Sequence, residues 1–187
     1  MPRTDILNDP ERRVAVLDIE ASGFGPQSYP IEVGVAIITT PAKPVGTWSS
    51  LIQPTEEWLS SGHWSPGSAQ VHGISVGQLQ RNGQPAPQVC AQLNALLKGA
   101  IVVTDAPTFD QPWLDRLFAA ADAEQSFIVR NLDLVADSLP PDERRQFSHL
   151  LRRNPAPHRA EADAFRLAAM LLEARLGYPA RRCAVVP

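Results

Sequence analysis

Two acidic residues stand at the end of an apolar run near the start of the sequence. In VAVLDIEASGFG, residues 14–25, Asp18 and Glu20 are separated by one residue. If this run is a strand, both side chains lie on one face, because strand side chains alternate. Neighbouring carboxylates repel each other unless a cation is present, and Mg²⁺ or Mn²⁺ suits oxygen ligands. The pair is therefore a candidate metal site, although for two acids taken alone a solvated surface pair at a strand end is the default.

Three further residues could join this pair. Asp110 follows a second apolar run and opens a helix, while Asp163 lies in the first turns of the last helix, five residues after His158. Taken alone, each acid could be a helix N-terminal residue that the helix dipole favours, and His158 could be an exposed loop residue. In open α/β sheets, ligands bind at the edge where the strands end. The spacing of all five residues therefore predicts one site at that edge.

The order of predicted elements indicates the fold class that must position these residues. The strands are expected at residues 13–20, 30–38, 46–54, 100–106 and 126–132. The helices are expected at residues 87–98, 108–123 and 159–176, with short helical turns and loops over 55–84. About ten residues separate the first two strands, too few for a helical crossover, so these strands should be antiparallel. This order predicts an α/β domain with a mixed sheet.

Composition narrows the class of protein further. The chain has 187 residues, 44% hydrophobic and 20% charged, as expected for one globular domain spanning 1–187 with a core over about 13–177. A net charge of −3 argues against a broadly basic protein that coats nucleic acid, but it permits a local basic cleft. Cys90 and Cys183 are far apart, which favours a reduced, cytoplasmic protein. No segment reaches the roughly 20 apolar residues of a membrane span, so we expect no membrane contact.

Three segments resemble the motifs of a known enzyme family. LDIEASG, FDQPWL and HRAEADA resemble the three exonuclease motifs of the DEDDh 3'–5' exonucleases, the enzymes of the proofreading-subunit, RNase T and oligoribonuclease type. The segment VHGIS, residues 71–75, resembles the family's His-Gly-Ile segment. The match covers about 150 residues. It includes, in order and spacing, Asp18, Glu20, Asp110, His158 and Asp163.

The resemblance implies a fold and a mechanism. The expected fold is ribonuclease H-like, with a five-stranded mixed sheet between helices and the second strand antiparallel to the others. Asp18, Glu20, Asp110 and Asp163 would hold two divalent cations, Mg²⁺ or Mn²⁺, with Asp18 as the bridge. His158 would be the general base that takes a proton from the attacking water. The product would be a nucleoside 5'-monophosphate from the 3' end of single-stranded RNA or DNA.

The resemblance also implies where the last nucleotide binds. Backbone groups of Ala21, Ser22, Gly23 and Phe24 would contact the 3'-terminal sugar, and Val71 and His72 would flank the base. For His72 a turn residue that simply packs is an equal alternative. Arginines 152, 153 and 159 could bind phosphates, although a solvated basic loop is the default for each. The tryptophans could stack bases, with core packing as the default.

Two positions depart from the family pattern. Ala21-Ser22 stand where many members have Thr-Thr or Thr-Gly, and Asp105 lies where many have His-Asn. Asp105 could be a strand-end residue or a partner of the metal ligands. These departures bear on substrate choice, since none of the five motif residues is missing.

Other classes of function remain open at this point. The same fold could serve a ribonuclease H-type endonuclease, or a nucleic-acid-binding module without catalysis. A dinucleotide-binding enzyme is disfavoured, because the first strand leads into EASGFG and not a glycine-rich phosphate turn. The sequence does not separate RNA from DNA. Some relatives are homodimers, so a homodimer is possible here.

Overall fold

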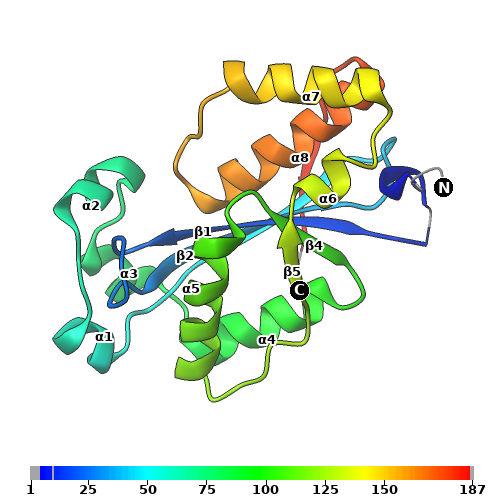
Figure 1. Ribbon diagram of the computed structural model, residues 1–187. Coiled ribbons are helices and arrows are strands. Elements are labelled where there is room, and N and C mark those ends of the chain that lie inside the picture. Colours follow the sequence, from blue (N-terminus) through cyan, green and yellow to red (C-terminus); the bar gives the residue numbers. More distant parts are fainter. Residues whose placement is uncertain (1–4, 10, 186–187) are drawn as a thin grey trace.

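The computed structural model describes residues 5–9 and 11–185 (Figure 1). The strands are β1 Val14–Ala21, β2 Pro30–Ile38, β3 Val45–Leu51, β4 Ile101–Thr104, β5 Val129–Asn131 and β6 Arg182–Ala184. The helices are α1 Glu56–Ser61, α2 Pro66–His72, α3 Val76–Asn82, α4 Ala86–Leu97, α5 Pro107–Ala120, α6 Asp133–Ala136, α7 Pro141–Arg153 and α8 Ala160–Leu176, with a 3₁₀ turn at Ile6–Asn8.

The strands form one mixed sheet in the order β5-β4-β1-β2-β3-β6. Only β2 is antiparallel to its neighbours; β1, β4 and β5 pair in parallel, as do β3 and β6. This arrangement confirms the mixed sheet and the antiparallel second strand. It also adds a sixth strand to the five expected, because the chain after α8 returns along the edge of β3 for three residues. Such a short, exposed segment has no burial pattern that could reveal it in the sequence.

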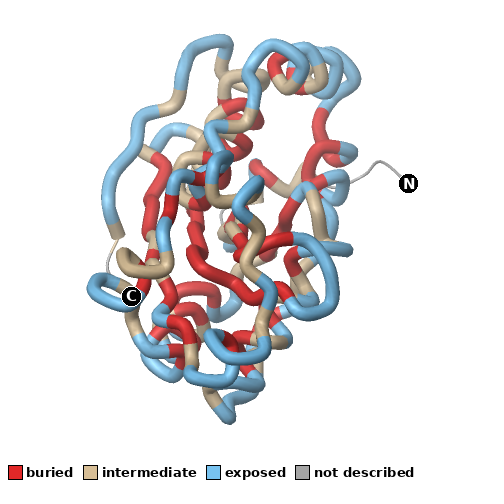
Figure 2. The backbone as a smooth tube through the Cα atoms, turned by 90° about the vertical axis from the view of Figure 1, so that its left-hand side faces the viewer, coloured by how far each residue is buried: buried red, intermediate tan, exposed pale blue. Residues whose placement is uncertain are grey.

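Helices cover both faces of the sheet and enclose two separate apolar cores. One core packs β1 and β2 against α4 and α5, and the other packs the opposite face against α6, α7 and α8. Figure 2 shows the buried strands inside and the exposed helical surfaces and loops outside. On β1, Leu17 and Ile19 belong to the first core, and Val14 and Val16 belong to the second. The alternation therefore directs Asp18 and Glu20, which follow Val16 on the same face, toward the side of α8.

Residues 55–84 form three short helices where turns and loops were expected. Thr55, Ser65 and Ser75 each cap one helix, because each hydroxyl accepts a hydrogen bond from a backbone N–H two or three residues into the first turn. Figure 1 shows these helices beyond the end of β1, away from the two helical layers. They place α2 beside the end of the first strand.

Two expectations from composition can be compared with the structure. Cys90 is buried and Cys183 is exposed, and both are free thiols. Across residues 5–9 and 11–185, none of the helices has the length and apolar character needed to cross a membrane.

Candidate active site

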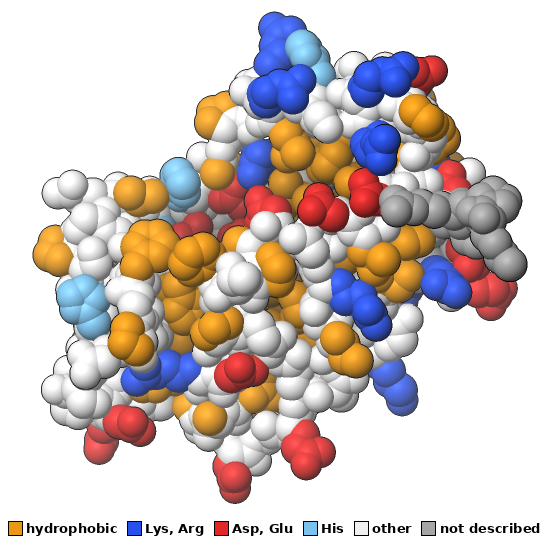
Figure 3. Space-filling model, in the orientation of Figure 1, with side chains coloured by type: hydrophobic (Ala, Val, Ile, Leu, Met, Phe, Trp, Pro, Cys, Tyr) orange, Lys and Arg blue, Asp and Glu red, His pale blue; other side chains and the backbone are white. Residues whose placement is uncertain are grey.

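A cleft of about 660 Å³ opens where β1 and β4 end. Its walls come from α2, from the first turns of α5 and α8, and from the loop before α8. In Figure 3, Asp and Glu side chains line a hollow near the centre of the face, with hydrophobic side chains beside them. All five predicted motif residues line the cleft, namely Asp18, Glu20, Asp110, His158 and Asp163. Five residues that span 145 positions of sequence therefore meet in one place, which is the arrangement the spacing predicted.

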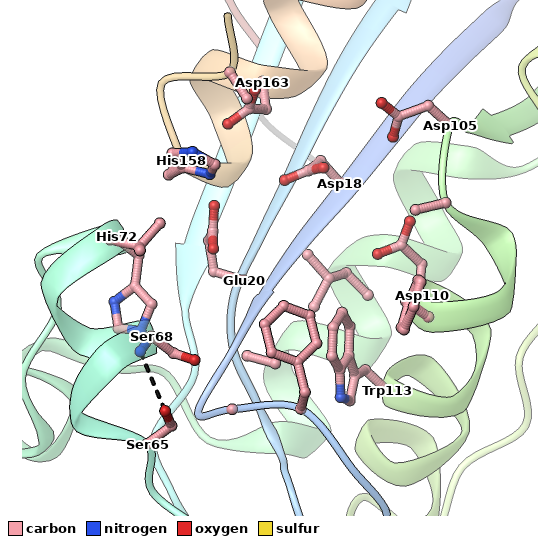
Figure 4. Close-up of a pocket in the computed structure, with 18 of the residues that line it drawn as sticks. Asp18, Glu20, Ser65, Ser68, His72, Asp105, Asp110, Trp113, His158 and Asp163 are labelled. Carbon is pink, nitrogen blue, oxygen red and sulfur yellow. Dashed lines mark hydrogen bonds between the residues drawn. The ribbon is translucent and has the colours of Figure 1, made fainter.

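Three of the acids form a tight cluster. Asp18, Glu20 and Asp163 each offer one carboxylate oxygen, and these atoms lie within 4.8 Å of one another. Asp110 lies on the far side of Asp18 from Glu20 and Asp163, so Asp18 stands between these two acids and Asp110 (Figure 4). Among the described residues, neither Asp18 nor Glu20 forms a hydrogen bond or an ion pair through its side chain.

The electrostatics of the cleft follow from this lack of partners. Burial raises the pKa of Asp18 well above its ordinary value, and the negative charge of Asp110 is the next cause. Burial and then the charge of Asp163 raise the pKa of Glu20 to about 7. Burial also raises the pKa of Asp110 to about 7, although a hydrogen bond from Thr104 opposes the shift. An all-oxygen donor set that resists ionisation until a cation arrives fits a hard divalent ion.

Asp110 is held in place by the end of β4. Its side chain is only 2% exposed, and the Thr104 hydroxyl donates a short hydrogen bond to one carboxylate oxygen. The backbone N–H of Ala106 in turn donates to the same hydroxyl, at 3.2 Å. Thr104 thus fixes Asp110. The sequence does not predict this role, because a threonine at the end of a strand is common and indicates no particular partner.

Asp163 is the one member of the cluster that has a cationic partner inside the protein. Arg166 Nε lies 3.2 Å from its Oδ1, and the same guanidinium donates to the Asn154 carbonyl at 3.0 Å. The backbone N–H of Arg159 donates to Oδ2 at 3.1 Å. Arg166 also lines the cleft, and its position three residues after Asp163 on a helix was the available signal for this pairing.

His158 occupies an unusual backbone conformation. Its φ is 58°, in the left-handed region, and its side chain is exposed at the mouth of the cleft. Non-glycine residues adopt this region rarely, although histidine does so more readily than most. Figure 4 shows the imidazole beside Asp163 and Glu20, on the side of the cluster away from Asp110.

The predicted sugar-binding segment is only partly in the cleft. Ala21, Gly23 and Phe24 line it, but Ser22 does not. Ser22 is fully buried; its hydroxyl donates to the His63 carbonyl at 2.7 Å and accepts from the Tyr29 N–H at 2.9 Å. Its own N–H and carbonyl are also bonded, to Tyr29 and Ser65. The structure thus uses Ser22 to close the loop after β1, because every polar group it has is already paired.

Val71 and His72 lie in the opposite wall, on α2. Val71 is 55% exposed, whereas His72 is buried and its Nδ1 accepts a hydrogen bond from the Ile74 N–H at 3.0 Å. That bond places the ring proton on Nε2, and burial lowers the pKa of His72. Nε2 has no hydrogen-bond partner among the described residues. His72 is therefore a neutral, packed side chain that also lines the cleft.

An exposed aromatic group borders the acids. Phe24 is 74% exposed and meets Phe109 edge to face, with ring centroids 6.1 Å apart. Phe109 is 52% exposed and stacks on Trp113 at 6.3 Å. The Trp113 indole N–H donates to the Ser28 hydroxyl at 3.0 Å, which anchors the group. Phe109 directly precedes Asp110 at the start of α5, and this adjacency is a feature of the sequence that could have predicted Phe109 as a residue of the cleft.

The remaining candidates divide between packing and the surface. Trp48 and Trp58 are buried in the core, and Trp64 packs against it, in agreement with the default expectation that the tryptophans pack in the core. Arg152 and Arg153 are exposed at the end of α7. The Arg159 guanidinium is bound to Glu32 through Nε and Nη2, and its side chain remains 45% exposed.

Asp105 lies in the cleft wall beyond β4. Figure 4 shows its carboxylate on the Asp110 side of Asp18, and desolvation raises its pKa while the charge of Arg166 opposes the shift. It lines the same cleft as the five motif residues. Asp105 thus directly follows the end of β4 and is also a neighbour of the metal-ligand candidates.

Comparison with known proteins places the fold. No family model and no curated protein matches this sequence. Among solved structures, E. coli exonuclease I in complex with a dA16 oligonucleotide is similar over 89% of this chain, with a TM-score of 0.65 and 16% identity. The same enzyme with a dT13 oligonucleotide gives a TM-score of 0.67 over 88% of the chain at 15% identity. The zinc ion bound form of the E. coli complex with single-stranded DNA gives 0.65 over 89% at 16%.

These likenesses have a defined scope. This chain covers 41–42% of those exonuclease I chains, so it spans about two fifths of their length. At such identities the likeness shows the fold, and the expected ribonuclease H-like α/β architecture is confirmed, with the sixth strand as a difference of detail.

Proposed function

We propose that this protein is a metal-dependent 3'–5' exonuclease that hydrolyses single-stranded RNA or DNA to nucleoside 5'-monophosphates. The observation that carries the proposal is the convergence of four acids and one histidine, predicted from three separate motifs, in a single cleft. The fold shared with exonuclease I in complex with oligonucleotides supports it. The proposed unit is one domain, residues 1–187, with its core over about 13–177.

The acids would hold two divalent cations, Mg²⁺ or Mn²⁺. Asp18, Glu20 and Asp163 would bind one, because their oxygens are already within 4.8 Å of one another. Asp18 and Asp110 would bind the other, since Asp18 lies between Asp110 and the other two acids of the cluster (Figure 4). When bound, such cations neutralise the charge that develops on a phosphate and lower the pKa of water.

His158 would move the proton in this reaction. An imidazole nitrogen of His158 accepts a proton from the water whose oxygen attacks the phosphorus of the terminal nucleotide. As the new P–O bond forms, the bond from phosphorus to the 3' oxygen of the preceding nucleotide breaks, and that oxygen takes a proton from solvent. The mononucleotide leaves with its 5' phosphate. The exposed position of His158 at the cleft mouth suits this role, because its ring reaches both water and the acid cluster.

The walls of the cleft would hold the end of the strand. Exposed Phe24 and Phe109 offer aromatic faces on which bases can stack without regard to sequence. Val71 and His72 close the other side, and Ala21 and Gly23 line the floor beside the acids. A volume of about 660 Å³ lies in the range of clefts that hold one small ligand. This size favours a single strand end over the passage of a duplex.

The test is digestion of 5'-labelled single-stranded RNA and DNA with Mg²⁺ or Mn²⁺, beside EDTA and Asp18→Asn controls. The expected result is a ladder that shortens from the 3' end and disappears in both controls. Internal cuts in a circular single strand would instead identify an endonuclease. Binding of both strands without cleavage at any metal concentration would identify a module that binds nucleic acid and does not cut it.

A further inference from the structure

One more buried acid lies next to the cluster and takes no part in the proposed mechanism. Glu32 on β2 stands directly opposite Glu20 on β1 in the sheet register, and it is only 4% exposed. A buried carboxylate needs hydrogen bonds and a partner charge to be stable. Its partners therefore show what it does.

Glu32 binds both the side chain and the backbone at the start of α8. Arg159 Nε and Nη2 donate to the two carboxylate oxygens at 3.0 and 2.6 Å, in a two-point contact. The backbone N–H of Ala160 donates to Oε2 at 3.0 Å. One carboxylate thus fixes Arg159 and the first residue of the helix together.

The segment that Glu32 holds contains two of the motif residues. Arg159 lies between His158, whose backbone is left-handed, and Ala160, the first residue of α8. The Arg159 N–H also donates to Asp163 Oδ2 at 3.1 Å. The side chain of Arg159 therefore anchors the segment to β2, while its backbone is bonded to a candidate metal ligand.

A glycine on the same strand makes room for this segment. A Cβ atom added to Gly34 would lie 2.1 Å from the Ala160 carbonyl carbon and 2.2 Å from the Glu161 nitrogen. Gly34 stands opposite Asp18 in the register. The start of α8 therefore packs directly on the backbone of β2. Gly34 permits this close approach, and Glu32 binds the same segment through hydrogen bonds.

We propose that Glu32 is a positioning residue for the exonuclease site, and that it acts through Arg159 to fix His158 and Asp163 against Asp18 and Glu20. The proposal rests on the proposed function. In that mechanism Glu32 is neither a metal ligand nor a substrate contact; its carboxylate sets the direction from which His158 and Asp163 enter the cleft. Gly34 serves the same end by letting the helix approach.

The test compares Glu32→Gln with Glu161→Gln. Glu161 lies on the same turn of α8, but its carboxylate accepts from the Ser49 hydroxyl at 2.8 Å and does not bond to residues 158–160. Because supporting residues of a metal site commonly contribute 10- to 100-fold, we expect Glu32→Gln to lower kcat by about that factor, with KM for the oligonucleotide about unchanged. Glu161→Gln should leave kcat near the wild-type value. Mn²⁺ affinity and the ¹³C NMR signal of the His158 imidazole should shift in Glu32→Gln and stay in place in Glu161→Gln.

A second variant keeps the test decisive if Glu32→Gln does not fold. Arg159→Gln breaks the same contact from the other side and leaves the bond from the Ala160 N–H to Glu32. If Glu32 acts through Arg159, the folded Arg159→Gln protein should have a lower kcat, and its Mn²⁺ affinity and His158 signal should shift. Wild-type values of all three in Arg159→Gln would overturn the positioning role.

The outcomes separate the two proposals. A folded Glu32→Gln protein with wild-type kcat, Mn²⁺ affinity and His158 signal would overturn the positioning role and leave the exonuclease intact. A wild-type protein that cleaves nothing would overturn the proposed function. In that case, Mn²⁺ affinity and the His158 signal would still decide the positioning role, and wild-type values in Glu32→Gln would overturn it.

Discussion

Glu20 and Glu32 are the same residue type, face each other across two neighbouring strands, and have opposite environments. Glu32 is surrounded by donors from Arg159 and Ala160. Glu20 has no hydrogen-bond or ion-pair partner among the described residues, and its pKa rises to about 7. Glu32 pairs with the guanidinium of Arg159, whereas Glu20 lies next to the carboxylates of Asp18 and Asp163. Glu32 is therefore a carboxylate that supports the structure of the site, and Glu20 is one whose oxygens are available to a ligand.

The difference has opposite consequences for stability. Removing the charge of Glu32 leaves Arg159 and the start of α8 without their partner, which destabilises the fold. Removing a charge from the open cluster relieves repulsion between acids and stabilises the metal-free protein.

The largest effect is expected for Asp18→Asn. Asp18 lies between Asp110 and the other two acids of the cluster, so its loss should disable both proposed ion positions. We expect kcat to fall by about 10³-fold, which corresponds to about 4 kcal/mol of transition-state stabilisation. The same change should raise the thermal unfolding temperature in EDTA, since it removes a buried charge among acids. Asp115→Asn, on the exposed face of α5, is the matched control. Unchanged activity in Asp18→Asn would break the account of the open cluster.

His158→Asn should have the next largest effect. Asparagine tolerates the left-handed backbone that His158 adopts, so the loop should keep its shape while the base is lost. General-base catalysis commonly contributes 10²- to 10⁴-fold, and we expect kcat to fall by about 10²-fold or more. Mn²⁺ affinity measured by titration should stay near the wild-type value. An equal loss of metal affinity would show that His158 acts as a ligand and not as the base.

The aromatic border should give a smaller effect, on substrate binding. Phe24→Ala removes an exposed ring from the Phe24–Phe109 pair. Stacking of one base on an aromatic side chain contributes about 1–3 kcal/mol, so KM for a single-stranded oligonucleotide should rise by about tenfold. Tyr178, which is 57% exposed and lies outside the cleft lining, gives the control Tyr178→Ala. Equal KM values for the two variants would remove the stacking role.

The smallest expected effect is the pH dependence of stability without metal. The pKa of Glu20 rises from its ordinary value of 4.5 to about 7, and that of Asp110 from 3.8 to about 7. The folded protein therefore binds these protons more tightly than the unfolded chain. Their contribution to stability is fully present below about pH 4 and is lost as the pH rises through 7.

The measurement is thermal unfolding in EDTA at pH 5 and pH 8, for the wild type and for Glu20→Gln. The glutamine variant should gain stability relative to the wild type as the pH rises. Mn²⁺ should stabilise the wild type more at pH 8 than at pH 5, because protons compete with the cation for the same oxygens. A constant difference between the two proteins across this range would contradict the raised pKa of Glu20.

The sequence predicted the acids and the histidine of the cleft better than it predicted the contacts that hold them in place. Asp18 and Glu20 stand out as acids at the end of an apolar strand, and the spacing from His158 to Asp163 marks a loop that enters a helix. Alternation along β1 also predicted which face the acids share. These features are local, so they can be read from short stretches of sequence.

The supporting contacts join residues far apart in the chain. Glu32 and Arg159 are 127 positions apart. Glu32 was visible as a lone acid within the apolar strand PIEVGVAII, but nothing in that strand names its partner. The bond from the Ser22 hydroxyl to the His63 carbonyl also joins residues 41 positions apart, so the sequence gives no sign of it. The edge strand β6 was not predicted, because its three exposed residues show no alternation of apolar and polar side chains.

The proposed catalytic cations bind to Asp18, Glu20, Asp110 and Asp163, and not to Glu32. The most direct test is titration of the protein with Mn²⁺, with free Mn²⁺ followed by electron paramagnetic resonance. Wild-type, Asp18→Asn and Glu32→Gln proteins would be compared at pH 8. The account predicts two bound ions in the wild type, loss of binding in Asp18→Asn, and weakened but measurable binding in Glu32→Gln. Equal Mn²⁺ binding by the wild type and Asp18→Asn would contradict it.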